Sequence, residues 1–209
     1  MDKYYCIEMD PNERTLGAYE RNVDKFIELT PKDTIGDTKL WLDLLIDKVN
    51  ADSDIFEIGS GFGRDAQYME SRGLTVQCSD GAPGFLGELA SRGLKAQYFN
   101  ALTDPFPGKY DLIFADAVFE HFTRQQFEGI LNKVHGATNE DGTLGFCVRR
   151  GDGEYWTSDK LDEERYFCLW QPDSLAEQIR DANFVLDTII ESTGYLDIER
   201  LYVVANKKS

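Results

Sequence analysis

The segment from Ile55 to Glu70, IFEIGSGFGRDAQYME, constrains the fold more than any other part of this chain. A short apolar run leads into a loop with glycine at every second position, and the loop leads directly into a segment with amphipathic helical spacing. Glycine tolerates backbone conformations that a Cβ disfavours, and it lets a ligand lie against bare main chain at a helix N-terminus. The segment therefore predicts a strand, a turn that can cradle a nucleotide, and a helix.

The spacing of the glycines narrows the class of nucleotide. A dinucleotide fingerprint has its third glycine three positions after the second, where this chain has Arg64. Asp80 stands at the end of the next apolar run, and a carboxylate there can accept both hydroxyl hydrogens of a ribose. A strand-to-helix turn that binds no ligand remains the alternative for a glycine loop taken alone.

Several segments in order resemble the class I S-adenosylmethionine-dependent methyltransferases. The first motif of that family reads acidic-x-Gly-x-Gly-x-Gly and stands here as EIGSGFG. QCSDGAPGFL and YFNALTDPF match the segments after its second and third strands, and KYDLIFADAVFEHF resembles its fourth strand and the following loop. DGTLGFCVRR resembles the fifth strand, RYFCLWQPDSLAEQIRDANFVLDTI the late helix and sixth strand, and LYVVANK the seventh. The resemblance covers about residues 13 to 207.

The resemblance implies one methyltransferase domain over residues 1–209, with an N-terminal helical lid at 13–50 and a cofactor-binding α/β core at 53–207. The implied fold is a Rossmann-like, seven-stranded, mostly parallel sheet with helices on both faces and an antiparallel last strand, preceded by the N-terminal helices. The implied cofactor is S-adenosyl-L-methionine, with S-adenosyl-L-homocysteine as its product. The residues expected to bind it are Tyr19, Glu57, Gly59, Ser60, Gly61, Gly63, Asp65, Asp80, Gly81, Asn100, Ala101, Asp116 and Ala117.

Hydrophobic periodicity supports this architecture independently. Two helices are expected before the first strand. Strands are then expected at 54–58, 74–78, 95–99, 110–115 and 143–148, with helices at 62–72, 83–92 and 124–134. Such alternation favours a parallel sheet covered on both faces. Thr123 and Gln126 predict a capping box, and the final strands, 184–190 and 200–205, are expected to be antiparallel because the turn around Gly194 is too short for a helical crossover.

Composition excludes several classes of function. The formal net charge of −16, from 22 basic and 38 acidic residues, disfavours nucleic acid, and ADAVFEHF lacks the Asp/Asn-Pro-Pro-aromatic box of amino-directed DNA methyltransferases. No apolar run reaches a membrane span and the N-terminus does not resemble a signal peptide, so we expect a cytoplasmic protein. Four cysteines without a CxxC pair and two histidines predict buried thiols and no metal site. The expected partner is a small-molecule or peptide substrate, without DNA or membrane, for a monomer or homodimer.

His121 is the catalytic candidate, because a neutral imidazole can act as a general base near pH 7. Simple packing of this histidine beneath a loop is the alternative. The acceptor side is expected to include Arg149, Arg150, Tyr155, Trp156 and Arg165. Arginine presents a planar fork that suits a carboxylate or phosphate, but the same arginines could instead pair with the plentiful acids nearby, and the aromatic residues could belong to the core.

The sequence is therefore interpreted as a methyltransferase of a small molecule or peptide terminus, with O-methylation, including that of a carboxylate, favoured over N-methylation. A detoxification methyltransferase of the tellurite-resistance type and a non-catalytic cofactor-binding subunit stay open as alternatives. A nicotinamide oxidoreductase is disfavoured by Arg64 in the third-glycine position.

Overall fold

The computed structural model describes residues 10–193 and 198–208. The strands are β1 Ile55–Ile58, β2 Val76–Asp80, β3 Ala96–Tyr98, β4 Tyr110–Asp116, β5 Thr138–Arg149, β6 Glu154–Thr157, β7 Arg165–Cys168, β8 Phe184–Thr193 and β9 Glu199–Lys207. The helices are α1 Pro11–Arg21, α2 Val23–Glu28, α3 Gly36–Ile46, α4 Arg64–Ser71, α5 Pro83–Ser91, α6 Arg124–Ala137 and α7 Pro172–Asp181, with a 3-10 turn, η1, at Phe119–His121.

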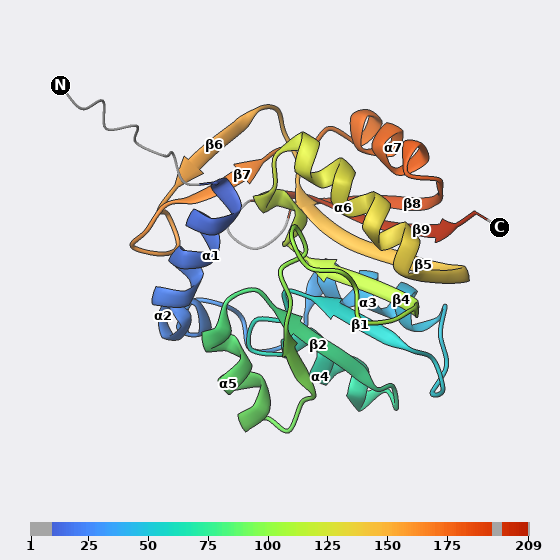
Figure 1. Ribbon diagram of the computed structural model, residues 1–209, viewed down its shortest axis with the longest axis horizontal. Coiled ribbons are helices and arrows are strands. Elements are labelled where there is room, and N and C mark those ends of the chain that lie inside the picture. Colours follow the sequence, from blue (N-terminus) through green and yellow to red (C-terminus); the bar gives the residue numbers. More distant parts are fainter. Residues whose placement is uncertain (1–9, 194–197, 209) are drawn as a thin grey trace.

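Seven strands form one sheet in the order β3-β2-β1-β4-β5-β9-β8 (Figure 1). The first five in this order pair in parallel, whereas β9 is antiparallel to both β5 and β8. This arrangement confirms the expected mostly parallel sheet with an antiparallel last strand. The turn expected around Gly194 lies outside the described residues.

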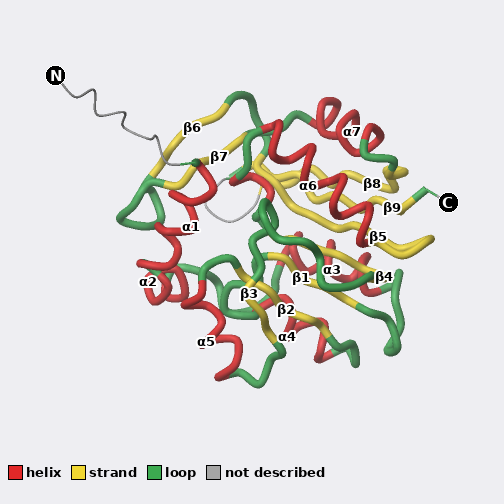
Figure 2. Tube along the Cα trace, viewed as in Figure 1, coloured by secondary structure: helices red, strands yellow, loops and turns green. Residues whose placement is uncertain are grey.

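Helices cover both faces of the sheet (Figure 2). One core cluster joins α3 and α4 to the strands through Trp41, Leu45 and Met69. The other joins α6 and α7 to the opposite face through Phe127, Leu131 and other apolar residues. The parallel strands alternate between the clusters, since neighbouring side chains point to opposite faces, as in Phe56 and Ile55. The Thr123–Gln126 capping box is present at the start of α6.

The N-terminal region differs from expectation in two ways. The first expected helix is broken at Asn22, whose backbone N–H bonds to Tyr19 O, so α1 and α2 are separate helices. The range 13–50 also does not form a lid as a whole. Trp41 and Leu45 of α3 are completely buried against the sheet, and the Trp41 indole donates to Val203 O, so α3 belongs to the core. Helices α1 and α2 instead lie over the loops at the carboxyl ends of the strands, where Leu16 approaches Gly81 and Phe26 approaches Gly61.

A second, two-stranded sheet was not expected from the sequence. Strands β6 and β7 follow β5 in the chain, precede α7 and pair antiparallel with each other. Figure 1 shows this hairpin beside α1. The segment between the two strands, residues 158–164, contains no Gly, Pro or Asn that would signal a hairpin turn. No helix within residues 10–193 and 198–208 has the length and apolar content needed to span a membrane.

Candidate functional site

The glycine loop joins β1 to α4 at the carboxyl edge of the sheet. Gly59 has φ +68°, and a Cβ there would stand 2.5 Å from a methyl carbon of Val118, so both conformation and space require glycine. The backbone N–H of Gly61 donates to Asp80 Oδ2 at 2.9 Å, and Ala82 N–H donates to Asp80 Oδ1 at 2.8 Å. Each oxygen of Asp80 therefore keeps a lone pair for a further donor. Burial raises the pKa of the Asp80 carboxyl to about 6.

Three carboxyl groups gather beside this loop. Arg64 binds Asp65 through two hydrogen bonds of 2.8 and 2.9 Å and binds Asp116 at 2.7 Å. Glu57 is buried, and its Oε2 has no hydrogen-bond partner among the described residues. Burial, with the nearby Asp65 charge, raises the pKa of Glu57 to about 8. One arginine facing three acids leaves this corner suited to a cationic donor such as an ammonium group.

The loops after β2 and β3 lie under α1. The Asn100 side-chain amide donates to Asn12 Oδ1 at 2.8 Å and its Oδ1 accepts Leu102 N–H at 3.0 Å. A Cβ at Gly81 would stand 2.9 Å from Leu16 Cδ2, and neighbouring Ala101 is buried. Helix α2 approaches the glycine loop itself, since a Cβ at Gly61 would stand 3.4 Å from Phe26 Cε1. The expected cofactor-binding loops therefore converge beneath a two-helix cover.

Tyr19, His121 and Arg165 form one hydrogen-bonded chain. His121 Nδ1 lies 2.7 Å from Tyr166 O, and a carbonyl can only accept, so Nδ1 carries the proton. Because burial lowers the pKa of His121 to about 3, the ring is neutral and Nε2 accepts from the Tyr19 hydroxyl at 2.9 Å. Tyr19 in turn accepts from an Arg165 N–H at 3.2 Å. The structure thus brings the lid candidate, the catalytic candidate and one expected arginine together.

The three expected arginines have different surroundings. The Arg165 residue is only 2% exposed, no described carboxylate pairs with it, and its Nε lacks a hydrogen-bond partner among the described residues. Arg149 pairs with buried Glu120 at 3.3 Å and donates to the Tyr155 hydroxyl at 2.7 Å. Arg150 pairs with Glu191 at 2.7 Å on the surface.

The expected acceptor residues also differ in their aromatic contacts. The Arg149 guanidinium lies 3.8 Å from the centre of the Phe167 ring. The expected acceptor residue Trp156 stacks under Arg14 at 4.2 Å and packs against Tyr166, on the side of the hairpin facing α1. Arg165 and Arg149 both lie over the Phe167 ring, which packs against His121, whereas Arg150 pairs with Glu191 and Trp156 with Arg14.

Two basic residues near this site were not expected from the sequence. Arg200 on β9 reaches Glu120 at 3.6 Å, so one buried carboxylate faces two arginines. Lys160, in the turn between β6 and β7, donates to Thr30 Oγ1 at 2.6 Å. The sequence did not indicate that either residue belongs to the site. Arg200 lies in the last strand, far along the chain from the motifs, and Lys160 lies in an acidic stretch.

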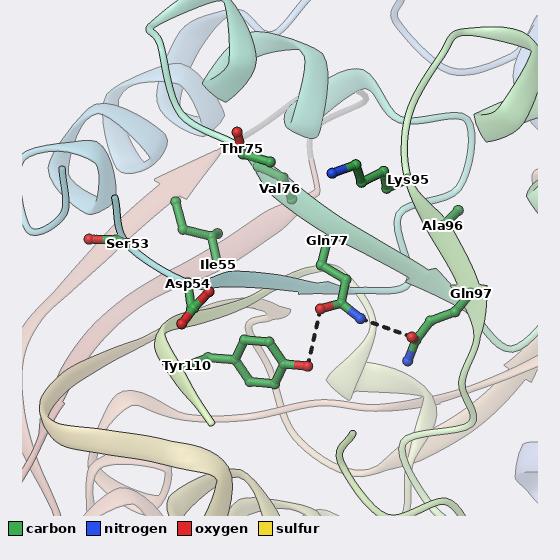
Figure 3. Close-up of a pocket in the computed structure, with 10 residues that line it drawn as sticks. All are labelled: Ser53, Asp54, Ile55, Thr75, Val76, Gln77, Lys95, Ala96, Gln97 and Tyr110. Carbon is green, nitrogen blue, oxygen red and sulfur yellow. Dashed lines mark hydrogen bonds between the residues drawn. The ribbon is translucent and has the colours of Figure 1, made fainter. Parts of the chain in front are cut away.

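A hollow of about 320 Å³ lies at the amino ends of the strands, opposite the site under α1 (Figure 3). It is lined by the first residues of β1, β2 and β3, and the Gln77 side chain bridges Tyr110 and Gln97 within it. Ligands of open α/β sheets bind beyond the carboxyl ends of the strands. This hollow lies at the amino ends, and it gathers no cluster of charged groups comparable with the site under α1.

Residues 56–146 match the family model described as "Methyltransferase domain". No curated protein matches the sequence. Among solved structures, 1,6-didemethyltoxoflavin-N1-methyltransferase from Burkholderia thailandensis, with 1,6-didemethyltoxoflavin and S-adenosylhomocysteine bound, is 16% identical with a TM-score of 0.70 over 95% of this chain and 87% of that one. Magnesium protoporphyrin IX methyltransferase from Synechocystis PCC 6803, with S-adenosylmethionine bound, is 11% identical with a TM-score of 0.74 over 97% and 99%.

The [4+2]-cyclase SpnF is similar at 12% identity with a TM-score of 0.72, over 95% of this chain and 96% of that one. At such identities the likeness shows the fold, and one fold can host unrelated reactions. The fold alone therefore does not fix the reaction, which depends on the residues under α1.

Proposed function

We propose that this chain, which belongs to the class I S-adenosylmethionine-dependent methyltransferases, methylates an oxygen of a small molecule or of a peptide end, with a carboxylate as the favoured acceptor. S-adenosylmethionine supplies a methyl group already activated on sulfur. What the chain has to contribute is the orientation of the acceptor, the exclusion of water and, for some acceptors, the removal of a proton. The cytosol is its proposed location.

The described residues fit this cofactor. Asp80 retains a lone pair on each oxygen for the two ribose hydroxyls, and the orphan Oε2 of Glu57 suits the methionyl ammonium. Gly59, Gly61 and Gly63 present backbone that no Cβ shields. We assign the adenine to the loop holding Gly81, Asn100 and Ala101, and the methionyl amino end to Ser60, Asp65, Asp116 and Ala117 together with Glu57.

Arg165 is the observation that favours an anionic acceptor. Moving a guanidinium from water into the protein interior costs on the order of several kcal/mol, as for other buried ions, unless a nearby anion compensates for its charge. No described carboxylate supplies that compensation for Arg165, and its Nε has no hydrogen-bond partner among the described residues. A guanidinium binds an anion through two parallel N–H groups. Arg149, already facing Glu120 and donating to Tyr155, lies over the same Phe167 ring as Arg165. Arg150 and Trp156 would then support the wall from outside.

The state of His121 favours the same acceptor. A carboxylic acid ionises near pH 4 in water and needs no base at neutral pH, whereas an alcohol or amine does. His121 is a poor base, because burial lowers its pKa to about 3 and its Nε2 is already engaged by Tyr19. We therefore assign His121 to the positioning of Tyr19, which in turn holds Arg165.

Methyl ester formation can be tested without knowing the acceptor beforehand. The purified enzyme is incubated with methyl-labelled S-adenosylmethionine and pools of small carboxylic acids, phenols, alcohols and amines. The proposal expects label in a product that releases methanol in mild alkali, as esters do. A label confined to alkali-stable products would show ether or N-methylation and exclude the carboxylate.

Changing His121 to Asn is expected to lower kcat modestly, by about tenfold or less, because positioning rather than proton removal is lost. The kcat profile against pH should keep its shape between pH 6 and 8, the region where a histidine of ordinary pKa titrates. A collapse of kcat that alkaline pH partly restores would instead identify His121 as a base and an acceptor that must lose a proton.

The affinity for S-adenosylhomocysteine should fall as the pH drops through about 6. Only the ionised Asp80 accepts from both ribose hydroxyls, so each pH unit below its pKa should cost about tenfold in affinity. Above the pKa the group is ionised and its contribution should be constant. Calorimetry from pH 4.5 to 8 measures the slope, and Asp80→Asn, which cannot titrate, should make it shallower below pH 6. An unchanged slope in that variant would assign the pH effect to another group.

A further inference from the structure

The turn between β6 and β7, residues 158–164 and here called the flap, is fastened to α1 and α2 by ion pairs on its outer side. Asp162, Glu163 and Glu164 pair with Lys25, Arg21 and Arg14, respectively. All three pairs are partly solvent-exposed, so they form a weak, salt-sensitive closure. Every acid of the flap from 162 to 164 is used in this way.

Lys160 is the basic residue of the flap and it points inward. Its ammonium lies 4.0 Å from the centre of the Phe26 ring and donates to Thr30 Oγ1, and no described carboxylate pairs with it. Phe26 is the side chain that approaches Gly61 of the glycine loop. The Phe26 ring therefore lies against the Lys160 ammonium and also approaches Gly61, which links Lys160 to the glycine loop from the side of the helical cover.

The electrostatic surroundings of Lys160 favour an anion. Burial, together with the charges of Arg165, Arg200, Arg64 and Arg149, lowers the pKa of Lys160 to about 7. A lysine held among cations gains a proton and a partner when a carboxylate enters. This is unusual placement in a chain with a formal net charge of −16, where acids are plentiful.

The sheet side of the same loop has the opposite character. Glu57 is the penultimate residue of β1, Asp65 lies in the first turn of α4 and Asp116 ends β4. Arg64 pairs with Asp65 and Asp116. Acids therefore approach the glycine loop from the sheet, and a lysine approaches it from the cover. An α-amino acid carries an ammonium and a carboxylate on one carbon, and this pair of charges suits such a zwitterion.

We infer that Lys160 is a cofactor-binding residue whose ammonium holds the methionyl carboxylate of S-adenosylmethionine, so that the flap closes on the amino-acid end of the cofactor. The inference rests on the cofactor and is independent of which acceptor the enzyme methylates. It also assigns a purpose to the ion pairs of the flap, because they hold Lys160 in the closed position. Exposed pairs can open readily to admit the cofactor.

The test compares two ligands that differ in the amino-acid moiety. S-adenosylhomocysteine carries the carboxylate, whereas 5′-methylthioadenosine shares the adenosine and thioether but lacks it. In Lys160→Met, affinity for S-adenosylhomocysteine should fall about ten- to a hundredfold, as for loss of one charge-assisted hydrogen bond, while affinity for methylthioadenosine stays unchanged. Lys160→Arg should recover part of the loss. Calorimetry measures both ligands, and ligand-free thermal unfolding confirms that the variants fold.

Lys25→Met is the matched control, since it removes a basic residue from the outside of the same closure. It should weaken S-adenosylhomocysteine by at most a few-fold and leave methylthioadenosine unchanged, because the pairs of Arg14 and Arg21 still hold the flap closed. The inference is overturned if Lys160→Met weakens both ligands to the same degree, which would make Lys160 a structural latch. Unchanged affinity for S-adenosylhomocysteine also overturns the inference, and would leave acceptor binding as the role of Lys160. No acceptor is present in these measurements, so the proposed methylation reaction can fail without affecting the result.

Discussion

Asp80→Asn is expected to weaken S-adenosylhomocysteine binding by about a hundredfold or more. A hydrogen bond to a charged acceptor contributes about 1.5–3 kcal/mol, and two ribose hydroxyls depend on this carboxylate. The amide nitrogen introduced by the change would also face the N–H of Gly61 or Ala82, which Asp80 accepts in the native protein. Both effects act in the same direction. Calorimetry at pH 7.5 measures the change.

Asp111→Asn provides the matched control. Asp111 also accepts a backbone N–H, from Asp54 at 2.9 Å, but it does so at the amino ends of the strands. Its change to an amide should leave the cofactor affinity unaffected. Binding to Asp80→Asn within threefold of the native protein would contradict the assignment of Asp80 to the ribose.

Arg165→Met is expected to lower kcat/KM for the acceptor by about 30- to 1000-fold, equivalent to about 2–4 kcal/mol for a two-point contact between arginine and an anion. S-adenosylhomocysteine affinity should change by only a few-fold, because Arg165 faces Tyr19 and not the glycine loop. Arg165→Lys keeps the charge but not the planar fork and should recover only part of the loss.

Arg150→Met separates this effect from a general loss of positive charge. Arg150 already pairs with Glu191 on the surface, so its change should leave kcat/KM close to native. Equal losses in the two variants, or no loss in Arg165→Met, would show that the acceptor is not held by the Arg165 guanidinium. Initial rates of S-adenosylhomocysteine release at varied acceptor concentration supply both constants.

Most of the fold could be predicted because its signals are local. The period of apolar residues, the glycine loop and the Thr123 capping box each lie within one short segment, and the parallel sheet with its antiparallel end is confirmed. The match of residues 56–146 to a methyltransferase domain agrees with the family interpreted from EIGSGFG and the motifs that follow. The break at Asn22 and the β6–β7 hairpin were missed, since both depend on contacts between α1 and the flap that are distant in sequence.

The candidate site was predictable only on its cofactor side. Strand ends of a parallel sheet converge at one edge, so Glu57, Asp80 and Asp116 could be placed together from their positions alone. The roles of individual side chains there stay predictions that the variants above test. On the acceptor side, three arginines looked equivalent in the sequence, yet one is buried without a carboxylate partner, one faces Glu120 and one is on the surface.

The sequence by itself determined the class of this protein. The glycine loop and the acidic strand end each lie within one short segment, and each has the chemistry that the cofactor requires. Only the tertiary structure decided which charges are left uncompensated. Whether Arg165 or Lys160 finds a carboxylate depends on segments more than a hundred residues away, such as Tyr19 and Phe26 in the cover. Electrostatic interactions act between neighbours in space, whereas the patterns of a sequence record neighbours along the chain.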